Sequence, residues 1–265
     1  MSSFDGSCGT IHYEQWLPYG EPTGIVVLVH GYAEYGARYA HVAERLTSLG
    51  VAVYAEDHMG HGHSDGERAL ITDFGDVVAD LETLVRIATD AHPEVPLLMI
   101  GHSMGGLLTA RFAQANPDAV AGIGFLGAVI GDWNWARDAL AAPELPEAAT
   151  DFSGMSRDES TVVAYSTDPL IYRGRYKRPL LEAEMRALDG FQTDIHRLSM
   201  PVLFCHGDDD PYVDYRTSLA AVEAMPSADT TIRVYEGARH ELVNETNRDE
   251  VIDEIVAFVA RLIDG

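Results

Sequence analysis

Short apolar runs alternate with segments of helical period along most of the chain. Residues 24–29 form a continuous run rich in β-branched residues, which is typical of a strand covered on both faces. Residues 10–16 alternate between apolar and polar positions instead, which indicates an exposed antiparallel strand. Further apolar runs predict strands over residues 51–55, 96–100, 119–126, 201–205 and 230–235.

Amphipathic segments lie between these runs. Residues 38–49 have helical periodicity and end at Gly50, a residue common just beyond the last turn of a helix. Residues 76–91 and 248–263 have the same periodicity, and another helix opens at residue 106. This alternation predicts one α/β domain with a mostly parallel central sheet and helices on both of its faces.

Residues 131–198 break the alternation. They contain no strong strand pattern, and tryptophan, tyrosine and phenylalanine residues are mixed with charged ones. Pro143, Pro146 and Pro169 are expected to interrupt any long helix there. We predict that this segment is an inserted helical cap over the site, and that residues 1–130 and 199–265 form the core. Ordinary crossover helices are the alternative interpretation.

Composition narrows the possible partners. The chain has 265 residues, of which 46% are hydrophobic, so it is long enough for one large domain with a substantial core. Its formal charge of −24 would repel the phosphates of nucleic acids and anionic lipid headgroups, so no nucleic acid partner is expected. The acidic residues are scattered, which indicates a solvated surface.

The cysteines and the N-terminus indicate in which cellular compartment the protein is expected. Cys8 and Cys205 are too few and too far apart for a disulfide framework, which suits a reducing compartment. The N-terminus lacks the basic and apolar regions of a signal peptide, and no apolar stretch is long enough for a membrane span. We therefore expect a soluble, cytoplasmic protein.

Residues 101–105 form the pattern G-x-S-x-G between a predicted strand and a predicted helix. In this context the pattern predicts a nucleophile at a sharp turn, where the hydroxyl of Ser103 stands above the edge of the sheet. The start of the following helix would favour developing negative charge beside it. The alternative is an ordinary glycine-rich turn that happens to contain a serine.

A serine hydroxyl needs a base to take its proton and an acid to orient that base. His240 follows the predicted strand 230–235 and comes last in the expected order of serine, acid and histidine, so it is the candidate base. The acid stays open by spacing alone, because four aspartates share the preceding loop: Asp208, Asp209, Asp210 and Asp214. No metal is predicted there, since no partner stands at ligand spacing.

An acyl-transfer site also needs donors for the oxyanion. The backbone N–H of Met104, directly after the nucleophile, is one candidate. The N–H of Tyr32 is the other, because His30 and Gly31 follow the strand 24–29 at the position such a loop requires. His30 and Gly31 could instead simply end that strand.

Taken together, these motifs resemble the monoacylglycerol lipase and lysophospholipase group of α/β-hydrolases, also called S33-type serine hydrolases. The similarity runs through nearly the whole chain in order. The matching segments are residues 30–39 (HGYAEYGARY), 57–64 (DHMGHGHS), 101–106 (GHSMGG), 167–170 (TDPL), 206–210 (HGDDD) and 235–240 (YEGARH). Met59 departs from an arginine frequent in the group, and Tyr32 is bulkier than the residue in some relatives.

The resemblance implies an α/β-hydrolase fold and a triad of Ser103, Asp210 and His240. It also implies that Glu34, Arg38 and Tyr165 shape a polar pocket for glycerol, although Glu34 and Arg38 could simply pair with each other. The implied reaction cleaves monoacylglycerols to glycerol and fatty acid through an acyl-serine, without a cofactor.

Other activities remain open at this point. A carboxylesterase, a thioesterase or a lysophospholipase could use the same triad, and a ligand-binding pseudoenzyme could keep the same scaffold. The expected partner is a small lipid ester, with transient contact between the cap and lipid surfaces and peripheral association with a membrane. No oligomeric state is predicted.

Overall fold

The computed structural model describes residues 2–263 and contains an eight-stranded sheet in the order β1-β2-β4-β3-β5-β6-β7-β8. β1 and β2 pair antiparallel, as do β2 and β4, and every other pairing is parallel. The strands are Ser2–Gly6, Gly9–Trp16, Gly24–Val29, Val51–Glu56, Leu97–His102, Gly122–Leu126, Val202–Gly207 and Thr230–Tyr235, β1 to β8 in that order. The predicted, mostly parallel sheet is confirmed.

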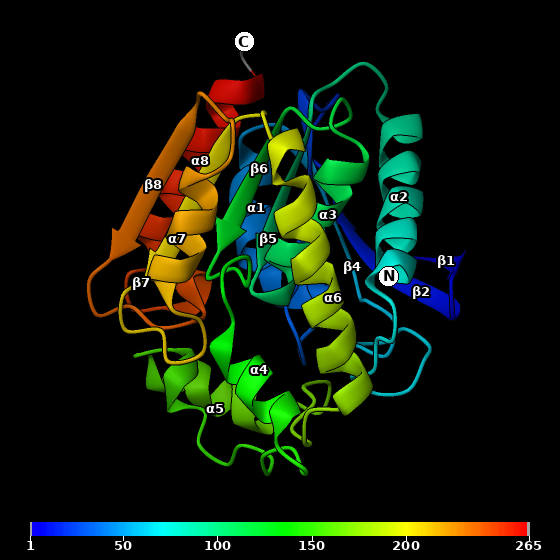
Figure 1. Cartoon of the computed structure of the whole chain (residues 1–265). Helices are drawn as coiled ribbons and strands as arrows, with labels where there is room; N and C mark the ends of the chain where they lie inside the picture. Colours follow the sequence, from blue (N-terminus) through cyan, green and yellow to red (C-terminus); the bar gives the residue numbers. More distant parts are fainter. Residues whose placement is uncertain (1, 264–265) are drawn as a thin grey trace.

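Helices cover both faces of this sheet (Figure 1). α1 (Ala40–Ser48) and α8 (Arg248–Ile263) pack on the side chains of one face, which include Val26 and Leu28. Val27 and Val29 point to the other face, as the period of two in a strand requires. The helices on that face are α2 (Phe74–Ala91), α3 (Met104–Ala115), α6 (Arg178–Asp194) and α7 (Tyr215–Glu223).

Both faces of the central strands are buried by these helices. Every residue of β3, β4, β5, β6 and β7 is buried, which explains why these strands were visible as continuous apolar runs. β1 was not predicted, because its five residues alternate between half-buried and exposed at the sheet edge. Met1 and residues 264–265, which the predicted core includes, lie outside the described residues.

The chain between β6 and β7 carries α4 (Asn134–Ala141), α5 (Glu159–Thr167) and then α6. α4 and α5 lie together beyond the carboxyl end of the sheet, at the bottom of Figure 1, whereas α6 runs back along α3. The expectation that prolines interrupt any long helix here was wrong for α6, which has 17 residues. Its own proline, Pro179, lies in the first turn, where no N–H is needed.

We keep the division into core and cap as a proposal: residues 131–198 form the cap, and α6 joins it to the helical layer of the core. The topology brings the ends of β3, β5, β7 and β8 to the edge of the sheet that this segment covers. Residues at those strand ends therefore face the cap. Within residues 2–263, no helix is long and apolar enough to cross a membrane.

Candidate active site

Ser103 lies at a strained turn between β5 and α3. Its backbone has φ 53° and ψ −122°, a conformation that side-chain-bearing residues rarely adopt. The turn is possible because the residues two positions before and after Ser103 are glycines. A Cβ on Gly105 would lie 2.1 Å from the Val29 carbonyl oxygen, and a Cβ on Gly101 would lie 2.2 Å from the Gly105 carbonyl oxygen. The sequence motif therefore reflects a steric requirement.

His240 connects Ser103 to a carboxylate. Its Nε2 lies 3.0 Å from Ser103 Oγ, and its Nδ1 lies 2.7 Å from Asp210 Oδ2. The other oxygen of Asp210 accepts hydrogen bonds from the backbone N–H groups of Tyr212 and Val213, at 2.8 and 3.1 Å. These contacts fix the carboxylate plane and leave Oδ2 directed at the imidazole.

The other aspartates of the same loop have different partners. Asp208 accepts a hydrogen bond from the Gly237 N–H, and Asp214 caps the start of α7. Asp209 lies beside Arg239 and is largely exposed. Of the four candidates left open by spacing, only Asp210 is hydrogen-bonded to His240 in the described part of the chain.

The two ionisable partners of this chain of contacts stabilise each other's charged forms. Burial would lower the pKa of His240, but the charge and hydrogen bond of Asp210 outweigh it and raise the pKa above 6.5. Burial would likewise raise the pKa of Asp210, but the opposite charge of His240 holds it below its usual range. His240 is thus a stronger base than a free histidine.

Two residues that line the cavity with Ser103 have backbone N–H groups without an acceptor in the described part of the chain. Met104 is the first residue of α3, so its N–H has no acceptor within the helix. The N–H of Tyr32 donates no hydrogen bond to the described part of the chain. Both residues line the same cavity as Ser103, which fits the predicted pair of oxyanion donors.

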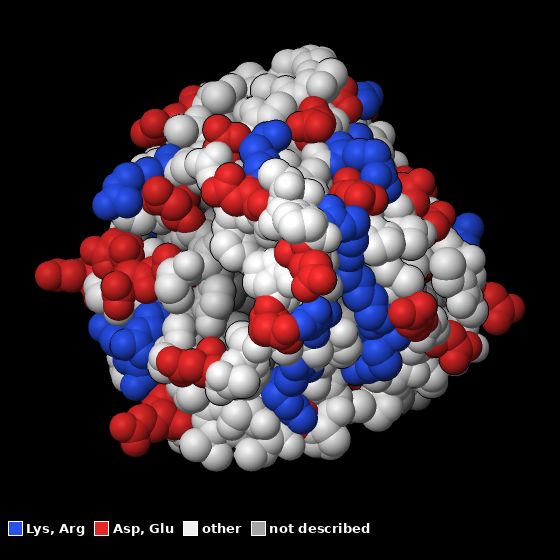
Figure 2. All heavy atoms as spheres, turned by 60° about the horizontal axis from the view of Figure 1, so that its bottom comes forward, with Lys and Arg blue, Asp and Glu red and all other residues white. Residues whose placement is uncertain are grey.

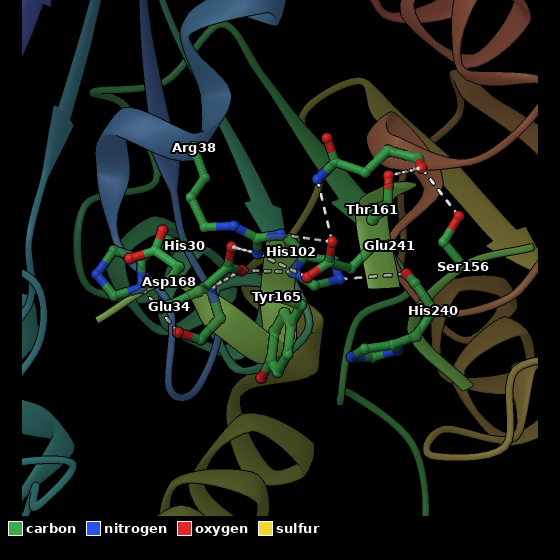
Figure 3. Close-up of polar contacts among 12 residues, drawn as sticks. His30, Glu34, Arg38, His102, Ser156, Thr161, Tyr165, Asp168, His240 and Glu241 are labelled. Atoms are coloured by element: carbon green, nitrogen blue, oxygen red, sulfur yellow. Dashed lines mark hydrogen bonds and ion pairs between the residues drawn. The ribbon is translucent and has the colours of Figure 1, made fainter. Parts of the chain in front are cut away.

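Glu34 lies in a dense hydrogen-bond network with His102 and Arg38 (Figure 3). Its two oxygens accept from the Gly31 N–H, the Tyr39 hydroxyl, Arg38 and His102, at distances between 2.8 and 2.9 Å. Burial would raise the pKa of Glu34, but the hydrogen bond from His102 and the charges of His102 and Arg38 hold it well below its usual range. Glu34 is therefore a buried carboxylate that also braces the loop after β3.

His102 joins this network to the candidate base, a role that was not predicted from the sequence. Its Nδ1 donates to Glu34 Oε1 at 2.8 Å, and its Nε2 lies 3.2 Å from the backbone carbonyl oxygen of His240. His102 thereby ties the nucleophile turn to the loop that carries His240.

Arg38 forms the other side of the network. It donates to both oxygens of Glu241, at 2.6 and 2.7 Å, and its guanidinium lies 5.3 Å from the centre of the Tyr165 ring. Arg38 does not line the cavity, but Glu34, Glu241 and Tyr165 do. Sequence reasoning missed Glu241, and its position directly after His240 was the only available signal.

The cavity above Ser103 has a volume of about 380 Å³, within the range of small-molecule sites. One wall carries the polar groups of Glu34, His102, His240 and Glu241. The rest is mostly apolar or aromatic and comes from the core and the cap: Met104, Val129, Trp133, Trp135, Phe152, Tyr172 and Tyr176. A ligand with one polar end and one apolar end matches this division.

The side chains of the described residues do not form a recognisable metal-binding site. Across residues 2–263, no three histidine, cysteine, aspartate or glutamate side chains are arranged to hold a metal ion. Within the run of aspartates at residues 208–210, Asp208 accepts a hydrogen bond from the Gly237 N–H and Asp210 contacts His240.

Comparison with known proteins agrees with this arrangement. The model of the family described as serine aminopeptidase, S33, matches residues 20–247. The chain belongs to this family. Within the S33 family it is 34% identical to a monoacylglycerol lipase of Mycolicibacterium smegmatis, over 97% of this chain and 95% of the relative. It is also 31% identical to the monoglyceride lipase of Homo sapiens, over 93% and 85%.

A solved structure of an S33 relative has the same fold. The crystal structure of the Paleococcus ferrophilus monoacylglycerol lipase superposes with a TM-score of 0.82 and 25% identity, covering 95% of this chain and 99% of that one. The S33 chain described here therefore has the α/β-hydrolase fold and is a hydrolase, as its sequence predicted.

Proposed function

We propose that the chain hydrolyses monoacylglycerols to glycerol and fatty acid. The observation that carries the proposal is the contact of Ser103 with His240, and of His240 with Asp210, inside a cavity that has one polar wall and one apolar wall. The relatives named as monoacylglycerol lipases support it, because this chain matches them over most of their length.

In the first half of the reaction, His240 Nε2 takes the proton of Ser103 Oγ as that oxygen attacks the ester carbonyl carbon. The carbonyl electron pair moves onto the oxygen, where the N–H groups of Tyr32 and Met104 stabilise the negative charge. Collapse of the intermediate breaks the bond to glycerol, which leaves with the proton held by His240. Asp210 orients the imidazole throughout.

In the second half, water replaces glycerol beside His240. His240 takes a proton from the water as its oxygen attacks the acyl carbon of the acyl-serine. The same two N–H groups stabilise the second oxyanion. Ser103 Oγ leaves with the proton from His240, and the fatty acid is released.

The glycerol end of the substrate fits the polar wall. Glu34 and Glu241 line the cavity, and a carboxylate oxygen accepts hydrogen bonds from the free hydroxyl groups of glycerol. Arg38 lies behind them and compensates their charge, so its role is positioning. Tyr165 covers this wall from α5.

The broader alternatives are not favoured. A carboxylesterase, a thioesterase or a lysophospholipase with the same triad would share Ser103 and His240, so the triad does not discriminate. The S33 relatives with at least 30% identity are named for monoacylglycerols, and a polar wall with two carboxylates suits glycerol better than a phosphate.

The cap is proposed to touch lipid surfaces transiently. Its side chains Trp135 and Val163 are 41% and 59% exposed, which suits contact with an apolar interface. Figure 2 shows the face that includes the cap, where basic side chains form a band between acidic ones beside a hollow. We propose a cytoplasmic location, which the free thiols of Cys8 and Cys205 support.

Hydrolysis rates over a panel of esters test the proposed function. The panel consists of mono-, di- and triacylglycerols, lysophospholipids, acyl thioesters and p-nitrophenyl esters with matched acyl chains. We expect the highest kcat/KM among natural lipids for monoacylglycerols, and Glu34→Gln should reduce this preference. A higher kcat/KM for lysophospholipids or thioesters would contradict the proposal.

A further inference from the structure

One carboxyl group in the cavity wall has no partner. Glu184 lies on the buried face of α6, one turn from Leu180 and one turn from Leu188, and is only 1% exposed. Its Oε2 has no hydrogen-bond partner, and no cation among residues 2–263 pairs with the side chain. Burying a carboxyl group without a partner is costly, so this position calls for an explanation.

The hydroxyl group of Tyr32 is a second polar group of the cavity wall that lacks a hydrogen-bond partner. It is buried without a hydrogen-bond partner, and Tyr32 lines the same cavity as Glu184. The Tyr32 ring stacks on the ring of Tyr176, with centroids 4.4 Å apart. Tyr32, Tyr176 and Glu184 all line this one cavity, so the two unpartnered groups face a common space.

The two unpartnered groups belong to the mostly apolar part of the cavity. The Tyr32 ring stacks on Tyr176, which contacts Trp135, and Trp135 in turn contacts Trp133. Glu34 and Glu241 belong to the polar wall. The polar wall is already assigned to glycerol by the proposed function. The groups at Glu184 and Tyr32 are therefore available to the acyl part of the substrate.

The chemistry of the pair selects one kind of ligand group. Burial raises the pKa of Glu184 to about 8, so the carboxyl group is mostly protonated at neutral pH and can both donate and accept a hydrogen bond. The Tyr32 hydroxyl also donates and accepts. An aliphatic or aromatic hydroxyl group satisfies both partners, whereas a plain hydrocarbon chain leaves both unsatisfied.

We propose that Glu184 and the Tyr32 hydroxyl form a polar subsite that binds a hydroxyl group carried by the acyl chain of the substrate. This inference rests on the proposed function, since it assumes that the acyl group occupies the mostly apolar part of the cavity. It makes the chain selective for hydroxylated acyl esters over unsubstituted ones.

Matched substrates test the subsite directly. The probes are a medium-chain monoacylglycerol and a series that carries one hydroxyl group at successive positions of the same chain. For the wild type, kcat/KM should be about tenfold or more higher for one position of the hydroxyl than for the plain chain. Glu184→Leu should abolish this preference by raising kcat/KM for the plain chain and lowering it for the hydroxylated one.

Two variants control for other effects. Glu184→Gln keeps a donor and an acceptor and should retain a preference for the hydroxylated chain. Glu182→Leu changes an exposed glutamate of the same helix and should leave the preference of the wild type unchanged. Equal preferences in the wild type and Glu184→Leu would overturn the subsite, and so would a preference for a chain that ends in an ammonium group.

A binding measurement separates this proposal from the proposed function. A medium-chain diol should raise the Tm of the wild type more than the matching mono-alcohol does, and Glu184→Leu should remove the difference. If no ester is hydrolysed but the diol still stabilises the protein selectively, the function is wrong and the subsite stands. If both ligands stabilise equally, the subsite is wrong whatever the turnover.

Discussion

The core and the cap are held together by different interactions. In the core, strands such as β3 and β5 are buried along their whole length between two layers of helices. In the cap, α5 buries only one side chain, Tyr165, and arginines anchor the backbone instead. Arg178 donates to the carbonyl oxygens of Leu140 and Ala142, and Arg239 donates to those of Ser153 and Ser156.

The residues that carry out the reaction therefore belong to the core, whereas many residues that contact the substrate belong to the cap. The nucleophile, base and acid all follow the ends of strands in the apolar core, which holds them on rigid elements. The cap supplies much of the cavity wall from short segments held by polar contacts. Such segments open locally at lower free energy than a packed sheet, which suits a cover that admits substrate.

The largest expected effect comes from the acid in the core. Asp210→Asn should lower kcat by roughly 10⁴-fold, because the imidazole of His240 loses the partner that sets its tautomer and orientation. Asp208→Asn is the matched control, since its side chain can still accept the hydrogen bond from the Gly237 N–H, and kcat should change little. Steady-state kinetics on a monoacylglycerol checks both variants; comparable losses would contradict the assignment.

Truncating one aromatic side chain in the core and one in the cap compares the packing of the two regions. Phe125→Ala in β6 removes a fully buried ring and should lower the free energy of unfolding by about 3–5 kcal/mol. Trp135→Ala in α4 removes a ring that is 41% exposed and should cost about 1 kcal/mol or less, while KM rises severalfold. Urea denaturation gives both values, and a larger loss for Trp135→Ala would reverse the comparison.

The arginine contacts of the cap can be removed individually. Arg178→Met keeps much of the side-chain length but leaves the carbonyl oxygens of Leu140 and Ala142 without their donor, which should cost about 1–2 kcal/mol of local stability. Arg137→Met removes only an exposed pair with Asp132 and should change little. Amide hydrogen exchange in α4 measures this, and equal protection in both variants would show that the cap does not depend on these bonds.

The smallest expected effect is a shift in pH dependence. Because the pKa of His240 is raised, kcat/KM should fall on the acid side with a midpoint above pH 6.5. The raised pKa of His240 also stabilises the fold below pH 6.5, and this contribution is lost as pH rises through the raised pKa. Activity therefore increases over the pH range in which this contribution to stability decreases. A midpoint at or below 6.5 would show that Asp210 does not act on the imidazole as described.

Sequence patterns predicted the core far better than the cap. Continuous apolar runs and the G-x-S-x-G motif report local constraints, such as burial on both faces and the close approach of Gly105 to Val29. The proline positions at residues 143, 146 and 169 gave no warning of α6, because the helix begins after all of them. Propensity alone does not show where a helix finds its packing partner.

The hydrogen-bond network around Glu34 could not be predicted from the sequence either. His102 contacts Glu34 and the His240 backbone, and Arg38 contacts Glu241, across separations of 68, 138 and 203 residues. Only the fold brings such residues together, whereas the triad followed from the order of residues and the resemblance to S33 hydrolases. Glu184 could have been noticed as one acidic residue in the apolar stripe of a helix.

Covalent labelling of Ser103 tests the central claim most directly. A fluorophosphonate reagent should form one adduct, on the peptide that contains Ser103, and hydrolysis of monoacylglycerol should be lost in proportion to the labelled fraction. Ser103→Ala should fold normally, resist labelling and lose roughly 10⁶-fold in kcat. Substantial hydrolysis by Ser103→Ala, or an adduct on another residue that accounts for the lost activity, would contradict the account.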